Sequence, residues 1–184
     1  MSDSTYFSPK FTGGSHSSRG YNYQDVCAFF CLFNFLNHDE TVNSIGFEMI
    51  NDFTINLNHQ NFSVQVKKQS LGISEINKIL KETVTMGNNN KVMLIATDFK
   101  KDLEKIIHIR NQYSNAMNSD LNIEWKEHIQ KEFEQLLVTN NIDGNIRNLF
   151  INGEFIKLPV EMSELALMAT VYRWAEKEKI SLNI

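Results

Sequence analysis

Residues 52–67 read DFTINLNHQNFSVQVK and contain two strand patterns separated by a polar turn. In the second pattern, apolar Phe62, Val64 and Val66 alternate with polar residues, and 52–57 alternates in the same way. A period of two residues is typical of a strand with one apolar and one polar face. The polar string 58–61 favours a turn, so the stretch predicts a β-hairpin.

The pairing of this hairpin depends on where its turn is centred. If the turn is symmetric about residues 59 and 60, Asp52 lies opposite Lys67, and a carboxylate faces an ammonium on the polar face. Glu48 precedes Asp52 by four residues, an even spacing that places it on the same side if the strand continues through a bend. We therefore expect four polar side chains to converge: Glu48, Asp52, Gln65 and Lys67.

Helix and strand patterns alternate on both sides of the hairpin. Residues 22–37 are so rich in apolar side chains that they predict a helix buried on most of its circumference. Strand-like runs fall at 44–50 and 92–97, and further helical patterns fall at 74–87, 102–117, 122–138 and 162–179. This order predicts an α/β fold, in which the last three helices either cover the sheet or form an interface.

The chain of 184 residues is long enough for one ordinary domain. Residues 1–20 are rich in Ser and Gly and are expected to be a flexible arm. The rest, 21–184, is expected to be a single domain, with its core at about 21–97 and a helical part at about 98–184. No apolar run approaches the length that spans a bilayer, and no basic region precedes a hydrophobic stretch at the N-terminus, so we expect a cytoplasmic protein with no membrane partner.

Charge and motif content exclude several functions. The formal net charge is −4 and no basic tail exists, which counts against binding nucleic acid through the overall field, so any DNA contact needs a specific site. Cys27 and Cys31 are expected to be core thiols. The five histidines lack the spacing of zinc ligands, and no phosphate-binding glycine loop is present, so neither a zinc site nor a bound nucleotide is expected.

The predicted polar cluster has the chemistry of phosphodiester hydrolysis. That reaction needs oxygen ligands for Mg²⁺, a positioned water and a cation near the charge that develops on the phosphate. Asp52 would be the primary ligand, Gln65 would offer its amide oxygen, and Lys67 would orient the water or stabilise charge. Glu48 would add a ligand or act through a bound water. In the simpler alternative, Asp52 merely ends a strand and Lys67 lies on a solvated sheet edge.

Three motifs resemble those of the PD-(D/E)xK restriction-endonuclease-like superfamily. Residues 19–24, Arg-Gly-Tyr-Asn-Tyr-Gln, look like the helix start of Mrr-like members, and 47–52, Phe-Glu-Met-Ile-Asn-Asp, resembles their E-x-x-x-D strand. Residues 65–67, Gln-Val-Lys, match the (D/E/Q)-x-K strand. The resemblance implies a mixed sheet core flanked by helices, with extra C-terminal helices.

Within this superfamily, residues 19–97 look most like the nuclease domain of anti-phage effector endonucleases from cyclic-oligonucleotide-signalling (CBASS) systems, also found as the nuclease subunit of Lamassu defence systems. This resemblance implies a DNA endonuclease that cuts double-stranded DNA and depends on Mg²⁺, or alternatively Mn²⁺. The metal ligands would be Asp52, Gln65 and Glu48, and Lys67 would complete the catalytic set. Gln24, on an apolar helix face, would support the site or only cap a backbone group. Many relatives have an acid at the position of Gln65, and an amide is the weaker magnesium ligand.

A nuclease without a sensor must be restrained, and we expect control by self-assembly of a homo-oligomer through the C-terminal helices. In the Lamassu-like version the partner would be an SMC-like ATPase complex, whereas in the signalling version the sensor is normally fused, and none fits in this chain. Two alternatives stay open. In the first alternative, the chain is an inactive binding or scaffolding subunit that retains the fold. In the second, it is a nuclease that acts on RNA.

Overall fold

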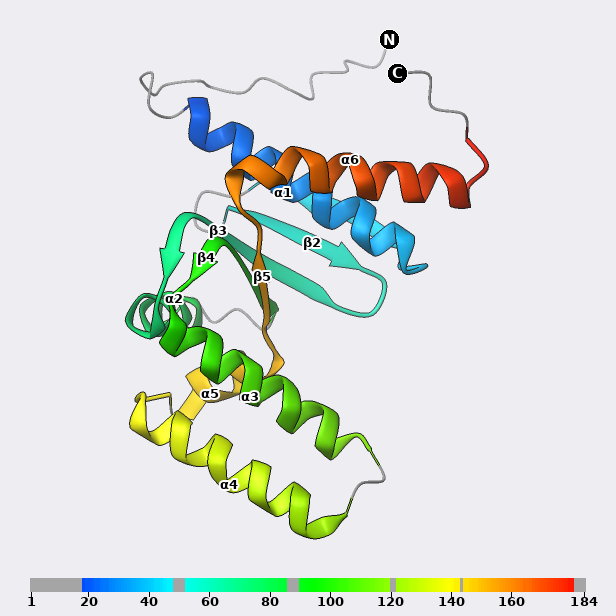
Figure 1. The fold of residues 1–184 in the computed structure, drawn as a ribbon. Helices are drawn as coiled ribbons and strands as arrows, with labels where there is room; N and C mark the ends of the chain where they lie inside the picture. The colour runs from blue at the N-terminus through cyan, green and yellow to red at the C-terminus, as the bar shows by residue number, and fades with distance from the viewer. Residues whose placement is uncertain (1–17, 48–51, 86–89, 120–121, 143, 181–184) are drawn as a thin grey trace.

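The computed structural model describes residues 18–47, 52–85, 90–119, 122–142 and 144–180. Within these ranges one five-stranded sheet has the order β1-β2-β3-β4-β5 (Figure 1). Its strands are β1 (Val42–Gly46), β2 (Phe53–Leu57), β3 (Asn61–Leu71), β4 (Lys91–Phe99) and β5 (Glu154–Lys157). The pairs β1–β2 and β2–β3 are antiparallel, whereas β3–β4 and β4–β5 are parallel. The sheet is therefore mixed, as the resemblance implied.

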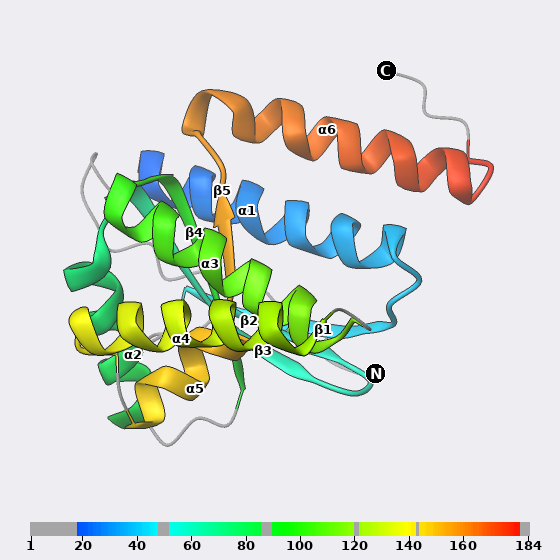
Figure 2. The same cartoon turned by 60° about the horizontal axis from the view of Figure 1, so that its bottom comes forward.

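Helices cover both faces of this sheet. Those that the structure describes are α1 (Ser18–Asn37), α2 (Ile73–Thr85), α3 (Lys101–Met117), α4 (Ile123–Thr139), α5 (Gly144–Asn152) and α6 (Val160–Lys177). One apolar cluster joins α1 and the start of α6 to one face of the sheet, and a second joins α2, α3, α4 and α5 to the other face. Figure 1 shows α1 and α6 on one side of the strands and α3, α4 and α5 on the other, and Figure 2 turns the molecule so that α3, α4 and α5 come forward. The predicted α/β architecture is confirmed.

Strand β4 is the centre of the core because both of its faces are covered. Every residue from Val92 to Ala96 is buried, and the strand lacks the alternation that a half-exposed strand shows. Val92, Leu94 and Ala96 belong to the cluster under α2 and α3, whereas Met93 and Ile95 belong to the cluster under α1. Because β3 pairs with β4, this division also fixes the face of the sheet on which each β3 side chain lies.

Helix α1 begins earlier than the sequence predicted. It begins at Ser18, inside the stretch 1–20 that was expected to be an arm, and residues 1–17 lie outside the described residues. Cys27 and Cys31 are both buried, as predicted, and the Cys31 thiol contacts the sulfur of Met93 at 3.7 Å. Helix α1 is therefore anchored on the sheet through its apolar face.

The part expected to be helical, 98–184, also supplies an edge strand that the sequence prediction missed. Strand β5 pairs with β4 through Met93 and Glu154, and α5 leads into it. A Cβ at Gly153, between the two, would lie 2.6 Å from the carbonyl oxygen of Leu149, so this position requires glycine. The guanidinium of Arg110 lies over the Phe155 ring, 5.0 Å from its centroid, and packs β5 against α3.

Among the described residues, none of the helices has the length and the apolar composition that a membrane span requires.

Candidate active site

The candidate site lies at the start of β2, beside the part of β3 that extends beyond the end of their pairing. The last pair of the β2–β3 ladder on this side is Phe53 with Val64, and β3 extends beyond it to Leu71. Asp52, directly before β2, donates its main-chain N–H to the Val64 carbonyl at 3.1 Å. Its carboxylate oxygen Oδ2 accepts from the main-chain N–H of Val66 at 2.5 Å. Beyond the last β2–β3 pair, the Asp52 side chain therefore accepts the main-chain hydrogen bond that a neighbouring strand would otherwise accept.

The amide and the amine of the site come from β3 itself. Gln65 and Lys67 are two residues apart, so their side chains lie on the same face of the sheet. Lys67 Nζ donates to Gln65 Oε1 at 3.1 Å, and both residues are half-buried. Their β4 partners are Leu94 and Ala96, which places them on the face that α2 and α3 cover, away from α1.

Gln24 contacts the site from α1. Its side-chain Nε2 donates to the main-chain carbonyl of Asp52 at 2.7 Å, and the side chain is half-buried. The sequence left two roles open, supporting the catalytic face or capping a backbone group. The structure shows that Gln24 caps the backbone of the catalytic candidate itself, so it positions the peptide that carries the Asp52 carboxylate.

The predicted register of the hairpin is wrong by two residues. Thr54 lies opposite Ser63 rather than Gln65, and Asp52, one step beyond the last pair, does not lie opposite Lys67. The reason is the turn, which is closed by a 2.9 Å bond from Leu57 N to the carbonyl of Gln60 and so centres one residue earlier than expected. A slip of two residues keeps every side chain on its predicted face, whereas a slip of one would reverse the faces.

Two parts of the predicted motif set lie outside what the structure describes. Glu48 falls within 48–51, so its predicted role as ligand stays a prediction. Of residues 19–22, the first four of the Mrr-like motif, only the helical backbone is described. The described contacts join Gln24 to Asp52 and Asp52 to Val66, the residue between Gln65 and Lys67, and these two contact each other.

Buried groups beside the site do not supply a nucleophile. The pKa of the Cys27 thiol is raised to about 12, chiefly by burial; a hydrogen bond with Tyr23 acts to lower this pKa, and the negative charge of Asp52 acts to raise it. Burial likewise raises the pKa of Tyr23, whose hydroxyl donates to the Leu158 carbonyl at 2.5 Å. A thiol becomes a good nucleophile only as the thiolate, so Cys27 is a structural group here.

The donor set suits a hard divalent cation. Asp52 offers a carboxylate, Gln65 an amide oxygen, and oxygen ligands of this kind are those that Mg²⁺ takes in proteins. The Asp52 carboxylate has about four lone-pair positions, so the bond from Val66 leaves capacity for a cation. Among the described residues no group of three or more carboxylate, imidazole or thiol side chains comes together, and Glu48, the further acid that the sequence predicts as a ligand, lies outside them.

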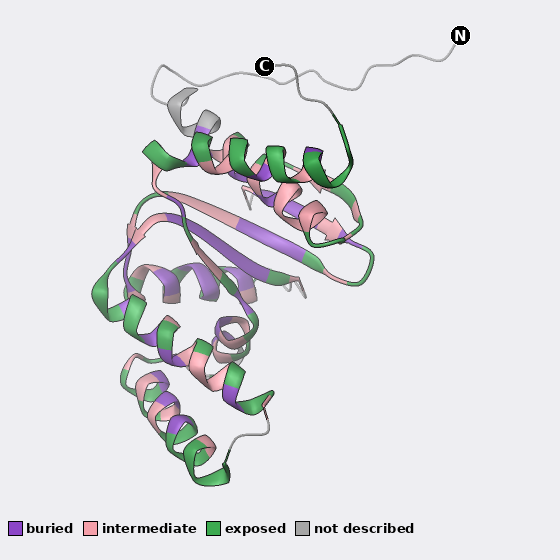
Figure 3. Cartoon of the chain, turned by 45° about the vertical axis from the view of Figure 1, so that its right-hand side comes forward, coloured by how far each residue is buried: buried purple, intermediate pink, exposed green. Residues whose placement is uncertain are grey.

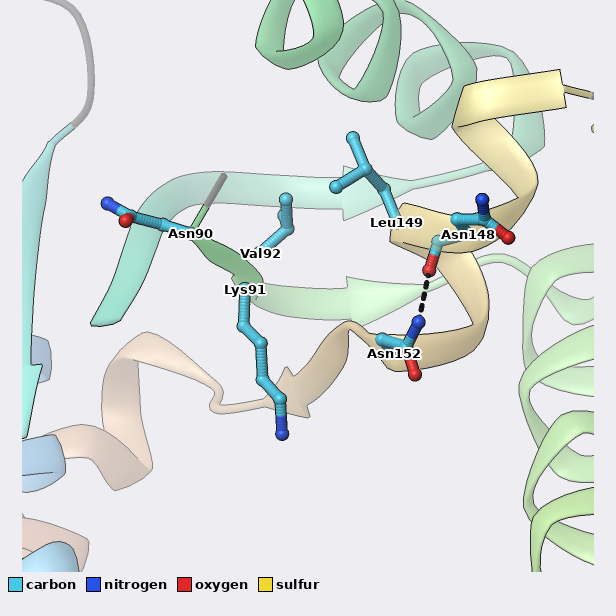
Figure 4. Close-up of a pocket in the computed structure, with 6 residues that line it drawn as sticks. All are labelled: Asn90, Lys91, Val92, Asn148, Leu149 and Asn152. Carbon is cyan, nitrogen blue, oxygen red and sulfur yellow. Dashed lines mark hydrogen bonds between the residues drawn. The ribbon is translucent and has the colours of Figure 1, made fainter. Parts of the chain in front are cut away.

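A pocket of about 260 Å³ lies elsewhere, between the start of β4 and helix α5 (Figure 4). Asn90, Lys91 and Asn148 are among its lining residues, and Asn152 donates to the Asn148 carbonyl at 3.0 Å within it. None of the described residues that line it is a carboxylate. Val92, one of its lining residues, pairs with Ser63 of β3. Ser63 precedes Lys67 by four residues, which is roughly 13 Å along the strand. The pocket is therefore separate from the candidate site.

A mixed sheet between helical layers, with an acid at a strand end beside a Gln-x-Lys strand, defines the restriction-endonuclease-like class of protein. Residues 12–180 match the family model of the Cap4 double-stranded-DNA endonuclease domain. The chain therefore belongs to this family, and the match extends well beyond the 19–97 on which the resemblance rested. Among curated proteins none matches the sequence significantly.

Solved structures with the same fold include Cap4 receptors that contain a SAVED/CARF domain. The Cap4 receptor of Moraxella osloensis aligns with a TM-score of 0.66 at 15% identity, over 89% of this chain and 39% of that chain. The receptor of Acinetobacter baumannii with the cyclic trinucleotide 2'3'3'-cAAA aligns with a TM-score of 0.64 at 17% identity, over 89% of this chain and 37% of that one. The chain thus spans well under half the length of these receptors, and at such identities the likeness shows the fold.

Proposed function

We propose that this chain is a metal-dependent endonuclease domain that hydrolyses phosphodiester bonds of duplex DNA in a bacterial defence system against phage or plasmid DNA. The observation that carries the proposal is the bond from Val66 N to Asp52 Oδ2 at 2.5 Å, which fixes the acid beside the Gln-x-Lys strand, where Lys67 Nζ donates to Gln65 Oε1 at 3.1 Å. Family membership supports the substrate class.

Each residue has a distinct task in the proposed reaction. Asp52 and Gln65, with Glu48, would hold Mg²⁺ or Mn²⁺, and the bound ion would polarise the phosphate under attack. Lys67 Nζ has three donors, of which Gln65 takes one, so the ammonium can also donate to a phosphate oxygen as negative charge develops on it. Gln24 holds the Asp52 peptide in place. The acidic net charge of the chain means that this local chemistry, rather than the overall field, would bind DNA.

Control of the activity is proposed to come from outside the described residues. The similar solved receptors carry a SAVED/CARF domain, and one of them holds a cyclic trinucleotide. By analogy we propose that a cyclic-oligonucleotide sensor, present on the same polypeptide or on a partner, regulates this domain. An SMC-like ATPase partner, as in Lamassu systems, remains the second form of control, and a gene neighbourhood with an SMC-like gene would favour it.

The test is plasmid cleavage by the purified chain with Mg²⁺ or Mn²⁺, alone and with the products of neighbouring genes. Lys67→Ala should lower the cleavage rate about 10²-fold or more, because one charge-stabilising donor is lost. Lys131→Ala, an exposed lysine on α4, is the matched control and should cleave like the parent chain. Cleavage that persists in both Asp52→Ala and Lys67→Ala would reject the assigned site. A duplex RNA of matched length, tested in parallel, decides between DNA and RNA as substrate.

One observation favours a second candidate, an endonuclease fold that binds without cutting. Position 65 is a glutamine whose oxygen already accepts from Lys67, and an amide is a poorer magnesium ligand than a carboxylate. Binding of the plasmid without cleavage under every metal and partner condition would support this scaffold role.

A further inference from the structure

Two main-chain carbonyls at strand ends accept hydrogen bonds from consecutive residues of α1. Asp52 directly precedes β2, and its carbonyl accepts from the Gln24 side chain at 2.7 Å. Leu158 directly follows β5, and its carbonyl accepts from the Tyr23 hydroxyl at 2.5 Å. Carbonyls at strand ends need partners from outside the ladder, and α1 supplies both. The start of this helix is therefore bonded to β2 on one side and to β5 on the other.

The Tyr23 contact leads to the strand position that carries the candidate lysine. The main-chain N–H of Leu158 donates to the carbonyl of Ala96 at 2.8 Å, just beyond the last pair of the β4–β5 ladder. Ala96 is also the residue of β4 that pairs with Lys67 of β3. Tyr23 is therefore connected, through Leu158 and Ala96, to the level of the sheet at which Lys67 lies.

Helical geometry explains how neighbouring residues of α1 contact strands that lie far apart. Successive side chains of an α-helix point about 100° apart, so one extends toward β2 while the next extends toward β5. These two strands are three strand spacings apart in the sheet, roughly 14 Å. One turn of α1 therefore spans the part of the sheet within which the candidate acid and lysine lie.

Tyr23 is enclosed on the face of the sheet that lies away from the candidate lysine. It is 4% exposed and belongs to the apolar cluster under α1, whereas Lys67 lies on the face that α2 and α3 cover. Figure 3 shows buried residues both in α1 and in the strands next to it. Burial raises the pKa of the Tyr23 phenol, so the hydroxyl stays protonated and remains a donor. A phenylalanine would fill the same space, so the hydroxyl contributes the polar contact alone.

We infer that Tyr23 is a positioning residue, whose hydroxyl acts with Gln24 to set the separation between the Asp52 carboxylate and the strand that carries Lys67. The inference rests on the proposed function, because it assigns Tyr23 a task in the same site. Without the hydroxyl, the start of α1 loses its bond to the end of β5, and the peptide that Gln24 holds is placed less accurately. The bond from the Val66 N–H to the Asp52 carboxylate should then lengthen.

The first experiment follows the Val66 amide proton by NMR on the full chain, without DNA or metal. In the parent chain this proton lies in a bond of 2.5 Å to a carboxylate, so its resonance should lie far downfield. Tyr23→Phe should move the resonance upfield, and Gln24→Leu should move it in the same direction. Tyr113→Phe is the matched control, because it removes a hydroxyl from a half-buried ring that packs against the other apolar cluster. It should leave the Val66 resonance unchanged.

The second experiment separates positioning from a general loss of stability. Because Tyr23 acts through Gln24, the double variant Tyr23→Phe/Gln24→Leu should show the same Val66 resonance as Gln24→Leu alone. In plasmid cleavage, Tyr23→Phe should lower kcat about fivefold with KM unchanged, and the double variant should again match Gln24→Leu. Two independent structural losses would instead add in the resonance shift and multiply in the rate.

The two experiments distinguish failure of this inference from failure of the proposed nuclease function. An unchanged Val66 resonance in Tyr23→Phe, or additive shifts in the double variant, overturns the inference even if the parent chain cleaves plasmid. The expected shifts, in chains whose circular dichroism matches that of the parent, support the positioning of Asp52 by Tyr23 even if the parent chain does not cleave.

Discussion

The carboxylate of Asp52 accepts a hydrogen bond from the main-chain N–H of Val66, the middle residue of the Gln-x-Lys strand. The bond joins two positions 14 residues apart and fixes the acid relative to the strand that carries Gln65 and Lys67. The orientation of the acid therefore depends on an acceptor atom, whereas its proposed cation chemistry depends on its negative charge. Substitutions can separate these two properties.

Asp52→Asn and Asp52→Ala should differ in stability, but both should lose DNA cleavage. Asparagine retains an oxygen that can accept from Val66, whereas alanine leaves this half-buried N–H without its partner, at a cost of about 1 to 2 kcal/mol in the free energy of unfolding. Both variants lose the negative charge, so both should lose cleavage. Urea unfolding and plasmid nicking measure the two effects. Full cleavage by Asp52→Asn would show that the charge is dispensable.

Gln65→Glu should strengthen divalent-cation binding. The substitution replaces an amide oxygen with a carboxylate at a position next to Asp52 and keeps an acceptor for Lys67. We expect the Mn²⁺ concentration at half-saturation, measured by calorimetry on the protein without DNA, to fall about tenfold or more. Gln65→Leu is the opposite control and should raise it. Equal affinity in all three chains would remove Gln65 from the ligand set.

Gln24→Leu should lower the cleavage rate, because the Asp52 peptide loses the 2.7 Å bond from the Gln24 side chain. We expect a fall of about tenfold in kcat with little change in KM, since Gln24 acts through Asp52 and not on the DNA. Gln135→Leu, at an exposed position on α4, is the control. A change in KM alone would indicate that Gln24 contacts substrate instead.

The loss of stability at acid pH should depend in part on the contacts of the Glu75 carboxylate at the start of α2. Its carboxylate accepts from Lys100 at 2.9 Å, from the Ser74 hydroxyl at 3.0 Å and from the Gly72 N–H at 3.0 Å. These bonds and one from its own main-chain N–H, with that of Lys100 the strongest, lower the pKa of Glu75 to about 2. The ordinary pKa of this carboxyl group is 4.5, so the stabilisation is complete above that pH and is lost as the pH falls toward 2.

The urea midpoint of the parent chain should consequently fall more steeply between about pH 4.5 and 2 than that of Glu75→Gln. Glu82→Gln, an exposed glutamate on α2, is the matched control and should follow the parent chain. Identical slopes for the parent and Glu75→Gln would contradict the assignment.

Several features of the fold could be predicted because they repeat with a fixed period. The alternation in 52–67 gave the correct faces of β2 and β3, since the period of two residues survives a register error of two. The long helical patterns were located to within a few residues, although α1 begins four residues before the predicted start at 22. The short elements α5 and β5 were missed, because nine and four residues carry too little pattern to distinguish them from loops.

The sequence alone determined the chemistry that is available: the acid, amide and amine of the candidate site, and the faces on which the amide and amine lie. Only the tertiary structure decided how they meet. The turn at 57–60 set the register, Val66 supplied the N–H that orients Asp52, and α1 brought Gln24 to the Asp52 carbonyl across 28 residues. Periodicity records which way a side chain points, but the partner of a main-chain group at a strand end is chosen by packing between distant segments, and no local pattern encodes it.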